Sequence, residues 1–163
     1  MKESIAWHGA VTVLFLVVIT FGAGVHTAEG APIYGVTTAN ALVRFDSATP
    51  GTVSTIGVIS GLQPGESIVG IDFRPSNGQL YGLGSTSRLY TINITNGVAT
   101  QVGSAGAFTL SGTDFGFDFN PVVDRIRITS NTGQNLRINP DNGTLTATDT
   151  PLNPGAPNVN ASA

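Results

Sequence analysis

A sequence repeat with a period of 46–47 residues limits the folds open to this chain more than any other feature. The clearest motif is GIDFRP at residues 70–75, which recurs as GFDFNP at residues 116–121. Two other motifs recur unchanged at the same spacing, YG at 34 and 81 and NG at 96 and 142. Two more recur as similar pairs of residues: FD at 45 is followed by IN at 92 and 138, and LY at 80 by IR at 126. Several motifs that share one spacing indicate that the chain is built from repeated structural units.

Residues 31–163 have the pattern of an all-β chain. They contain 17 Gly, 9 Pro and 12 Asn, which separate short apolar runs. No stretch of ten residues keeps the 3.6-residue apolar period of an amphipathic helix, and short runs between turn residues are typical of strands. Tight hairpin turns are expected at 76–78, 95–97 and 141–143, where Asn and Gly supply positive φ at low cost.

Each period holds about four strand-like runs. In the middle unit they are predicted at residues 80–83, 88–94, 98–102 and 115–119. Four short antiparallel strands in a unit of about 40–50 residues are typical of a propeller blade, and such units bury their apolar faces by stacking. The sequence therefore predicts an all-β, propeller-like array of four-stranded antiparallel units, with about three units present.

The number of units is small for a closed ring. The 133 residues of 31–163 hold about 2.9 units, whereas closed propellers have roughly four to eight blades. Three explanations remain open: a truncated chain, a homo-oligomer that closes the ring between chains, or an open stack. Truncation is favoured, and an isolated stack with two uncovered apolar faces is expected to be poorly stable.

The first thirty residues differ from the rest and are predicted to be a signal peptide. Residues 10–25 are sixteen uncharged, mostly apolar residues, which is short for a membrane span but suits the core of a secretory leader. Small residues at 28 and 30 favour cleavage there, and an uncleaved anchor is the alternative. The predicted location is therefore secreted, periplasmic or cell-surface, with no stable membrane span after cleavage.

The composition of residues 31–163 excludes much side-chain chemistry. They contain no His, Cys, Lys, Met or Trp, so no Ser-His-Asp or Cys-His system, no imidazole or thiolate zinc site and no disulfide can form. Six arginines against eight acidic residues leave a net charge of −2, which argues against nucleic acid as a partner.

Residues 68–97, IVGIDFRPSNGQLYGLGSTSRLYTINITNG, closely resemble a bacterial secreted family known as a domain of unknown function, number 4394. The pattern is G-[IF]-D-F-[RN]-P, an NG turn, L-Y-G-L and L-Y-x-I-[ND], and the GFDFNPVVDRIRI run at 116–128 is also typical of that family. The resemblance covers roughly residues 33–158. It implies an exported, propeller-like β domain of longer chains, and it supplies no catalytic residues.

Four repeated polar residues are the candidate ligand-binding site. Asp72 and Asp118 share one repeat position, and Arg74 and Asn120 follow each by two residues. A carboxylate beside a guanidinium fork could bind a polar ligand. The structural role is favoured, in which a repeated Asp caps or bridges a turn in every unit. No metal ligands are predicted, and no cofactor is expected. Calcium has no support, because no EF-hand-type loop is present.

The leading functional hypothesis is an exported, non-catalytic binding or interaction module of unknown ligand or surface partner. One alternative is an exported propeller-type enzyme, metal-assisted and active on a carbohydrate or lactone. The other is a purely structural repeat of a cell-surface protein. The missing His, Cys and Lys favour the non-catalytic hypotheses, and fold alone does not choose between them.

Overall fold

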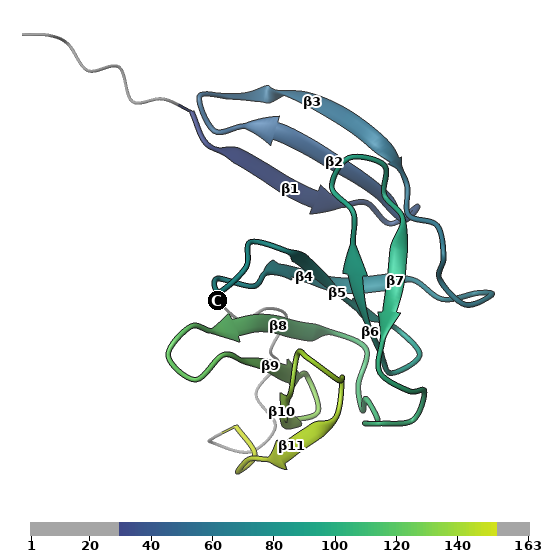
Figure 1. Cartoon of the computed structure of the whole chain (residues 1–163), viewed down its shortest axis with the longest axis vertical. Coiled ribbons are helices and arrows are strands. Elements are labelled where there is room, and N and C mark those ends of the chain that lie inside the picture. Colours follow the sequence, from purple (N-terminus) through teal and green to yellow (C-terminus); the bar gives the residue numbers. More distant parts are fainter. Residues whose placement is uncertain (1–29, 153–163) are drawn as a thin grey trace, which may run out of the picture.

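A computed structural model describes residues 30–152, which form eleven β-strands and no helix (Figure 1). No helix in this range could cross a membrane. The predicted signal peptide, residues 1–30, lies outside the described residues except for Gly30.

The strands form three antiparallel sheets, which confirms the all-β prediction. Sheet 1 has the order β1-β2-β3, sheet 2 the order β4-β5-β6-β7 and sheet 3 the order β8-β9-β10-β11. The strand bounds are β1 Pro32–Val36, β2 Ala41–Asp46, β3 Thr49–Val58, β4 Ile68–Phe73, β5 Leu80–Gly84, β6 Arg88–Ile92, β7 Ala99–Val102, β8 Phe115–Asn120, β9 Arg125–Ser130, β10 Asn135–Ile138 and β11 Leu145–Thr148.

The predicted strands of the middle unit are present, but one belongs to a different sheet. The run at 115–119 forms β8, which pairs with β9. It is therefore the first strand of sheet 3 and not the last strand of sheet 2. Sheet 2 begins instead with β4, which carries the first copy of the same G-[IF]-D-F motif. The motif thus marks the first strand of a sheet, and the predicted unit boundary was wrong by one strand.

Sheet 1 corresponds to the last three strands of the other sheets. Tyr34-Gly35 on β1 matches Tyr81-Gly82 on β5, and Phe45 on β2 matches Ile92 on β6. β4 and β8 therefore have no counterpart among the described strands of sheet 1. We call β4 and β8 the first strands; they pack side by side, and β1 contacts β4 (Figure 1).

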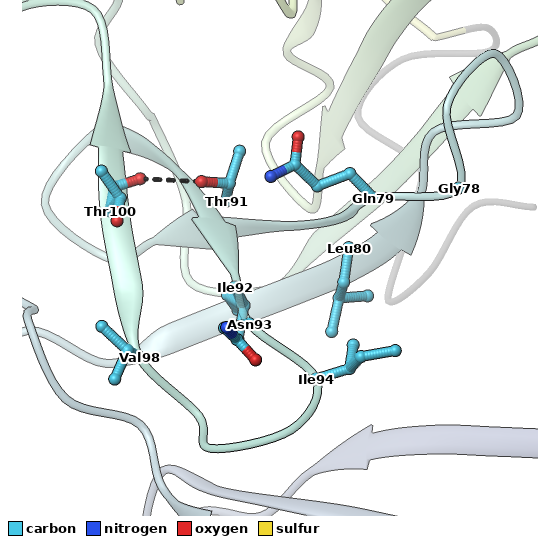
Figure 2. Close-up of a pocket in the computed structure, with 9 residues that line it drawn as sticks. All are labelled: Gly78, Gln79, Leu80, Thr91, Ile92, Asn93, Ile94, Val98 and Thr100. Carbon is cyan, nitrogen blue, oxygen red and sulfur yellow. Dashed lines mark hydrogen bonds between the residues drawn. The ribbon is translucent and has the colours of Figure 1, made fainter.

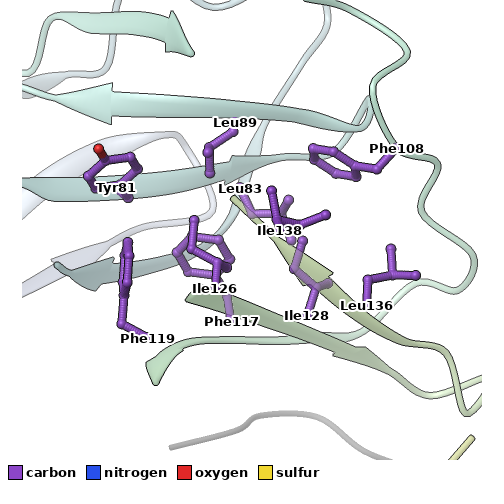
Figure 3. Packing of buried hydrophobic residues seen from close by; sticks show 10 residues of the cluster. All are labelled: Tyr81, Leu83, Leu89, Phe108, Phe117, Phe119, Ile126, Ile128, Leu136 and Ile138. Atoms are coloured by element: carbon purple, nitrogen blue, oxygen red, sulfur yellow. The ribbon is translucent and has the colours of Figure 1, made fainter. Parts of the chain in front are cut away.

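Two hydrophobic clusters lie between the sheets. Sheets 2 and 3 enclose the larger cluster, which is shown in Figure 3 and contains Tyr81, Leu83, Leu89, Phe108, Phe117, Phe119, Ile126, Ile128, Leu136 and Ile138. Sheets 1 and 2 enclose Leu42, Ile59, Ile68, Leu80, Tyr90, Ile92 and Ala99. Sheet 2 is therefore apolar on both faces, which is why it needs a neighbour on each side.

The two outer faces of the stack differ in polarity. Ile33 pairs with Phe45, and Gly35 with Val43, on the face of sheet 1 that points away from sheet 2. The outer face of sheet 3 carries two charged residues, Arg127 opposite Arg137. The expectation of two apolar outer faces is therefore wrong for sheet 3, because these arginines replace the Tyr and Thr of the preceding unit.

The predicted Asn-Gly turns connect β4 to β5, β6 to β7 and β10 to β11. Gly78, Gly97 and Gly143 have φ near +70°, as expected for these turns. The asparagines act differently from the prediction: Asn96 Oδ1 accepts the N–H of Val98 at 3.0 Å, so Asn closes the turn with its side chain rather than with positive φ.

Candidate functional site

Asp72, on first strand β4, bridges two sheets. Its Oδ2 accepts the backbone N–H of Phe119 on β8 at 2.8 Å, and its Oδ1 accepts the N–H of Phe73 at 2.7 Å. A carboxylate that accepts two main-chain N–H groups is fixed in place. The structure therefore gives Asp72 a role in joining sheets 2 and 3, and ligand binding by Asp72 stays a prediction.

Asp118, the repeat equivalent on β8, lies close enough to Asp72 for the two carboxyl groups to interact. Burial and the neighbouring Asp72 charge and hydrogen bond raise the pKa of Asp118 above its ordinary value. Asp118 pairs across the sheet with Arg127, so its side chain belongs to the outer face of sheet 3. The sequence repeat thus identified two carboxyl groups that the fold does bring together.

Arg74 follows β4 and forms ion pairs with two turns of sheet 3, the β8–β9 turn and the β10–β11 turn. Its Nη2 lies 2.6 Å from Asp124 Oδ2, and its Nη1 lies 2.7 Å from Asp141 Oδ1. The hydrogen bonds to Asp124 raise the pKa of Arg74 and lower that of Asp124. Because the Arg74 side chain is only 11% exposed and its guanidinium contacts both turns, Arg74 contributes to the contact between sheets 2 and 3.

Asn120 ends β8, and its Oδ1 accepts the N–H of Val122 at 3.0 Å. The ion pairs of Arg74 are with Asp124 and Asp141, in the β8–β9 and β10–β11 turns. Asp72 and Asp118 interact, Arg74 contacts two turns, and Asn120 caps one turn. A single ligand site formed by the four residues stays a prediction.

Glu66 is a buried carboxylate that no sequence motif had indicated. Its side chain is fully buried, and it accepts hydrogen bonds from Tyr90 Oη and Thr86 Oγ1, both at 2.5 Å. Burial opposes ionisation, but these hydrogen bonds outweigh it and lower the pKa of Glu66, while burial beside Glu66 raises the pKa of Tyr90 to about 12. The available sequence signal was that Glu66 is the only glutamate in residues 31–163.

Three arginines line a cavity of about 180 Å³ on sheet 3. Arg127 and Arg137 pair directly across β9 and β10, and their side chains are 40% and 39% exposed. Both lie near the single carboxylate of Asp149, at 3.6 and 2.7 Å. The other lining residues are Arg125, Asn120, Val123 and Ile126. We call this feature the arginine cavity.

The lining of the arginine cavity contains three arginines and no acidic residue, while Asp149 and Asp118 lie beside it. Arg125 Nη1 donates to the carbonyls of Asp124 and Val123, at 2.8 and 3.5 Å. Guanidinium groups present fixed pairs of N–H donors that match carboxylate and phosphate oxygens. The sequence signal was the alternation of Arg125 and Arg127, which places both on one face of a strand.

A second cavity, of about 390 Å³, lies on sheet 2 (Figure 2). Its lining contains no titratable side chain, and Thr91 Oγ1 donates to the carbonyl of Thr100 at 3.4 Å within it. The remaining lining residues are Gly78, Gln79, Leu80, Ile92, Asn93, Ile94 and Val98. This cavity can offer apolar contact and neutral hydrogen bonds, but no acid–base group.

Residues 30–152 contain no group of three or more His, Cys, Asp or Glu that could hold a metal ion. The three repeated antiparallel sheets define an all-β repeat protein with carboxylate bridges between its sheets. The family model described as Domain of unknown function (DUF4394) matches residues 41–163, and the chain belongs to this family. The match confirms the resemblance found in the sequence. No curated protein matches the chain.

Proposed function

We propose that this protein is an exported, non-catalytic binding module whose sheets are consecutive blades of a propeller-like array. The arrangement is supported by the regular order of the faces, because sheet 1 covers sheet 2 and sheet 2 covers sheet 3 through equivalent strands. It is also supported by the adjacent first strands β4 and β8. Export is supported by the uncharged run at 10–25.

The non-catalytic assignment rests on how the acidic side chains are used. Asp72 joins two sheets, Glu66 anchors a loop, and Asp124 and Asp149 pair with arginines. Carboxylates held in this way are committed to the structure, and a general acid or base must be able to reach a substrate proton.

The arginine cavity is the proposed binding site, and its ligand is an anion that carries carboxylate groups. The observation that carries this proposal is the pairing of two half-exposed guanidinium groups, Arg127 and Arg137, with one shared carboxylate, Asp149. A planar carboxylate can accept two parallel N–H bonds from an arginine, and a second carboxylate could be held by the neighbouring guanidinium.

Calorimetric titration with a trimer of galacturonic acid tests this proposal, with the neutral galactose trimer as the control ligand. We expect saturable binding of the acidic trimer alone, weakening as salt is added, because exposed charge pairs are screened. Arg127→Gln should weaken binding at least tenfold, whereas Arg44→Gln on β2, outside the cavity, should leave it unchanged. Equal binding of both trimers, or unaltered binding by R127Q, would contradict the proposal.

A further inference from the structure

Among residues 30–152, sheet 1 lacks the strand with which the other two sheets begin. In sheet 2, β4 pairs with β5, so that Asp72 lies opposite Tyr81 and Gly70 opposite Leu83. The strand of sheet 1 that corresponds to β5 is β1, where Tyr34 takes the place of Tyr81. β1 pairs only with β2 among the described strands, so no described strand takes the position that corresponds to β4.

Alternate residues of β1 direct their backbone N–H and C=O groups to the open edge, where a further strand could pair with them. Ser47 donates to the carbonyl of Ala31, and Thr37 donates to the carbonyl of Ala41, so residues 31, 33, 35 and 37 bond toward β2. Because antiparallel strands bond through alternate residues, Tyr34 and Val36 direct their N–H and C=O groups to the open side. β1 therefore presents an unused ladder of hydrogen bonds.

A groove lies along this edge, between β1 and β4. One cavity of about 260 Å³ is lined by Pro32, Ile33, Tyr34, Ile71, Asp72, Phe73 and Leu80. Another of about 170 Å³ is lined by Val36, Ile68, Val69, Gly70 and Ile71. Each cavity is lined by residues of both β1 and β4, and the two together are called the β1–β4 groove.

The contact between β4 and β8 shows how two first strands pack against each other. A Cβ on Gly70 would lie 2.6 Å from Cβ of Phe117, so only glycine allows this close approach. Asp72 accepts the N–H of Phe119. The repeat places Ile71 and Phe73 of β4 at the positions that Phe117 and Phe119 occupy in β8. In the β1–β4 groove, Ile71 therefore corresponds to Phe117, and the N–H of Phe73 corresponds to the N–H of Phe119.

We propose that the β1–β4 groove binds an extended peptide strand in trans that carries the pattern G-[IF]-D-F. In the bound register, the peptide Asp lies opposite Tyr34 and its Gly opposite Val36, as Asp72 and Gly70 lie opposite Tyr81 and Leu83. The peptide completes sheet 1 by strand addition. Its Gly lies against Ile71, and its Asp shares the N–H of Phe73 with Asp72 Oδ1, which accepts this N–H in the free protein.

The chemistry of the groove selects this partner over an arbitrary strand. The main-chain ladder of Tyr34 and Val36 gives affinity without regard to sequence, and side-chain contacts supply the selectivity. A β-branched residue in place of the peptide Gly would clash with Ile71, as a Cβ on Gly70 would clash with Phe117. A peptide without the Asp would lose the bond between sheets that corresponds to the one from Phe119 to Asp72, and the N–H of Phe73 would keep Asp72 Oδ1 as its one acceptor.

A fluorescent peptide with the sequence of residues 113–122, TDFGFDFNPV, is added to the purified protein to test this proposal. Anisotropy measures binding, and amide hydrogen exchange locates it. Peptides with Gly116→Val or Asp118→Ala serve as matched controls, and they leave the protein itself unaltered. We expect the parent peptide to bind at least tenfold more tightly than either control, and to protect the amides of Tyr34 and Val36.

Three results would overturn the proposal. Binding of the two altered peptides within twofold of the parent would show that the groove does not read the pattern. Protection confined to the open edges of β3, β7 or β11 would place the peptide elsewhere. Protection of the Tyr34 and Val36 amides before peptide is added would show that the edge is already filled, by a second copy or by another segment of this chain.

Discussion

At the scale of single residues, the acidic side chains separate into those that hold the fold and one whose charge opposes it. Asp72 and Glu66 accept several hydrogen bonds each. Asp118 instead lies close to Asp72, and burial and the nearby negative charge disfavour its ionised form. The same residue type therefore has opposite effects on stability at neutral pH.

Replacing Glu66 by Ala should destabilise the protein by about 2–3 kcal/mol, because Tyr90 and Thr86 would lose a buried charged acceptor. Urea unfolding followed by far-UV circular dichroism measures the change. Asp46→Ala is a suitable control, since Asp46 contacts the N–H of Ala48 at an exposed position. A change in unfolding free energy no larger than that of the control would contradict the role of Glu66 as a loop anchor.

The pKa of Asp118 is raised in the folded protein, so its ionisation opposes folding above the ordinary carboxyl pKa. Asp118→Asn should therefore raise the urea midpoint at pH 7. The gain should disappear as the pH falls below about 4, where the native carboxyl group is protonated as well. A midpoint difference that is the same at pH 7 and pH 3 would show that the Asp118 charge is not responsible.

At the scale of strands and turns, close contact between first strands depends on glycine. Gly70→Ala would place a Cβ 2.6 Å from that of Phe117, in the contact between β4 and β8. We expect a loss of about 1–3 kcal/mol from this overpacking. Gly51→Ala, with no atom within 4 Å of the new Cβ, should change stability little. Equal effects of both substitutions would argue against close packing of the first strands.

The glycines of the Asn-Gly turns should differ in cost according to their surroundings. Gly78 and Gly143 have φ values of +69° and +70°, so alanine is strained at both. A Cβ on Gly143 would also lie 2.6 Å from the carbonyl oxygen of Val102, whereas Gly78 has nothing within 4 Å. Thermal unfolding should therefore show a larger loss of Tm for Gly143→Ala than for Gly78→Ala; the reverse order would refute the described turn packing.

The sequence was sufficient for the four strands predicted in the middle unit but not for their grouping into sheets. The alternation of Phe115, Phe117 and Phe119 predicted β8, because period-two patterns report which face a residue occupies. The same pattern does not report which neighbour the strand pairs with. Pairing of β8 with β9 rather than β7 is a tertiary choice, and it placed the sheet boundary one strand away from the predicted position.

The candidate site was predictable only in part for a similar reason. The repeat placed Asp72 and Asp118 at equivalent positions, and the packing of first strands brought them together. Nothing in the local pattern around Arg74 indicated Asp124, which is 50 residues away in the chain. The arginine cavity was overlooked because Arg137 lies on another strand than Arg125 and Arg127, and it becomes their neighbour only through the register of β9 with β10.

At the scale of the whole molecule, the three sheets are equivalent units, and sheet 1 lacks its first strand among the described residues. The repeat matches the order of the sheets, since β1, β2 and β3 correspond to β5, β6 and β7. The apolar outer face with Ile33 and Phe45 is the end at which a preceding unit would pack. The truncated, ring-closed and open-stack explanations all stay predictions, because each is compatible with an incomplete first sheet.

Amide hydrogen exchange of the free protein is the sharpest test of this incomplete first sheet, because the repeat supplies its own controls. Tyr81 and Leu83 bond to β4, whereas their equivalents Tyr34 and Val36 lie on the open edge of β1. We expect slow exchange, near the rate of global unfolding, for Tyr81 and Leu83, and exchange orders of magnitude faster for Tyr34 and Val36. Equal protection of the two pairs would be incompatible with an open β1 edge, because sheet 1 would then already possess its first strand.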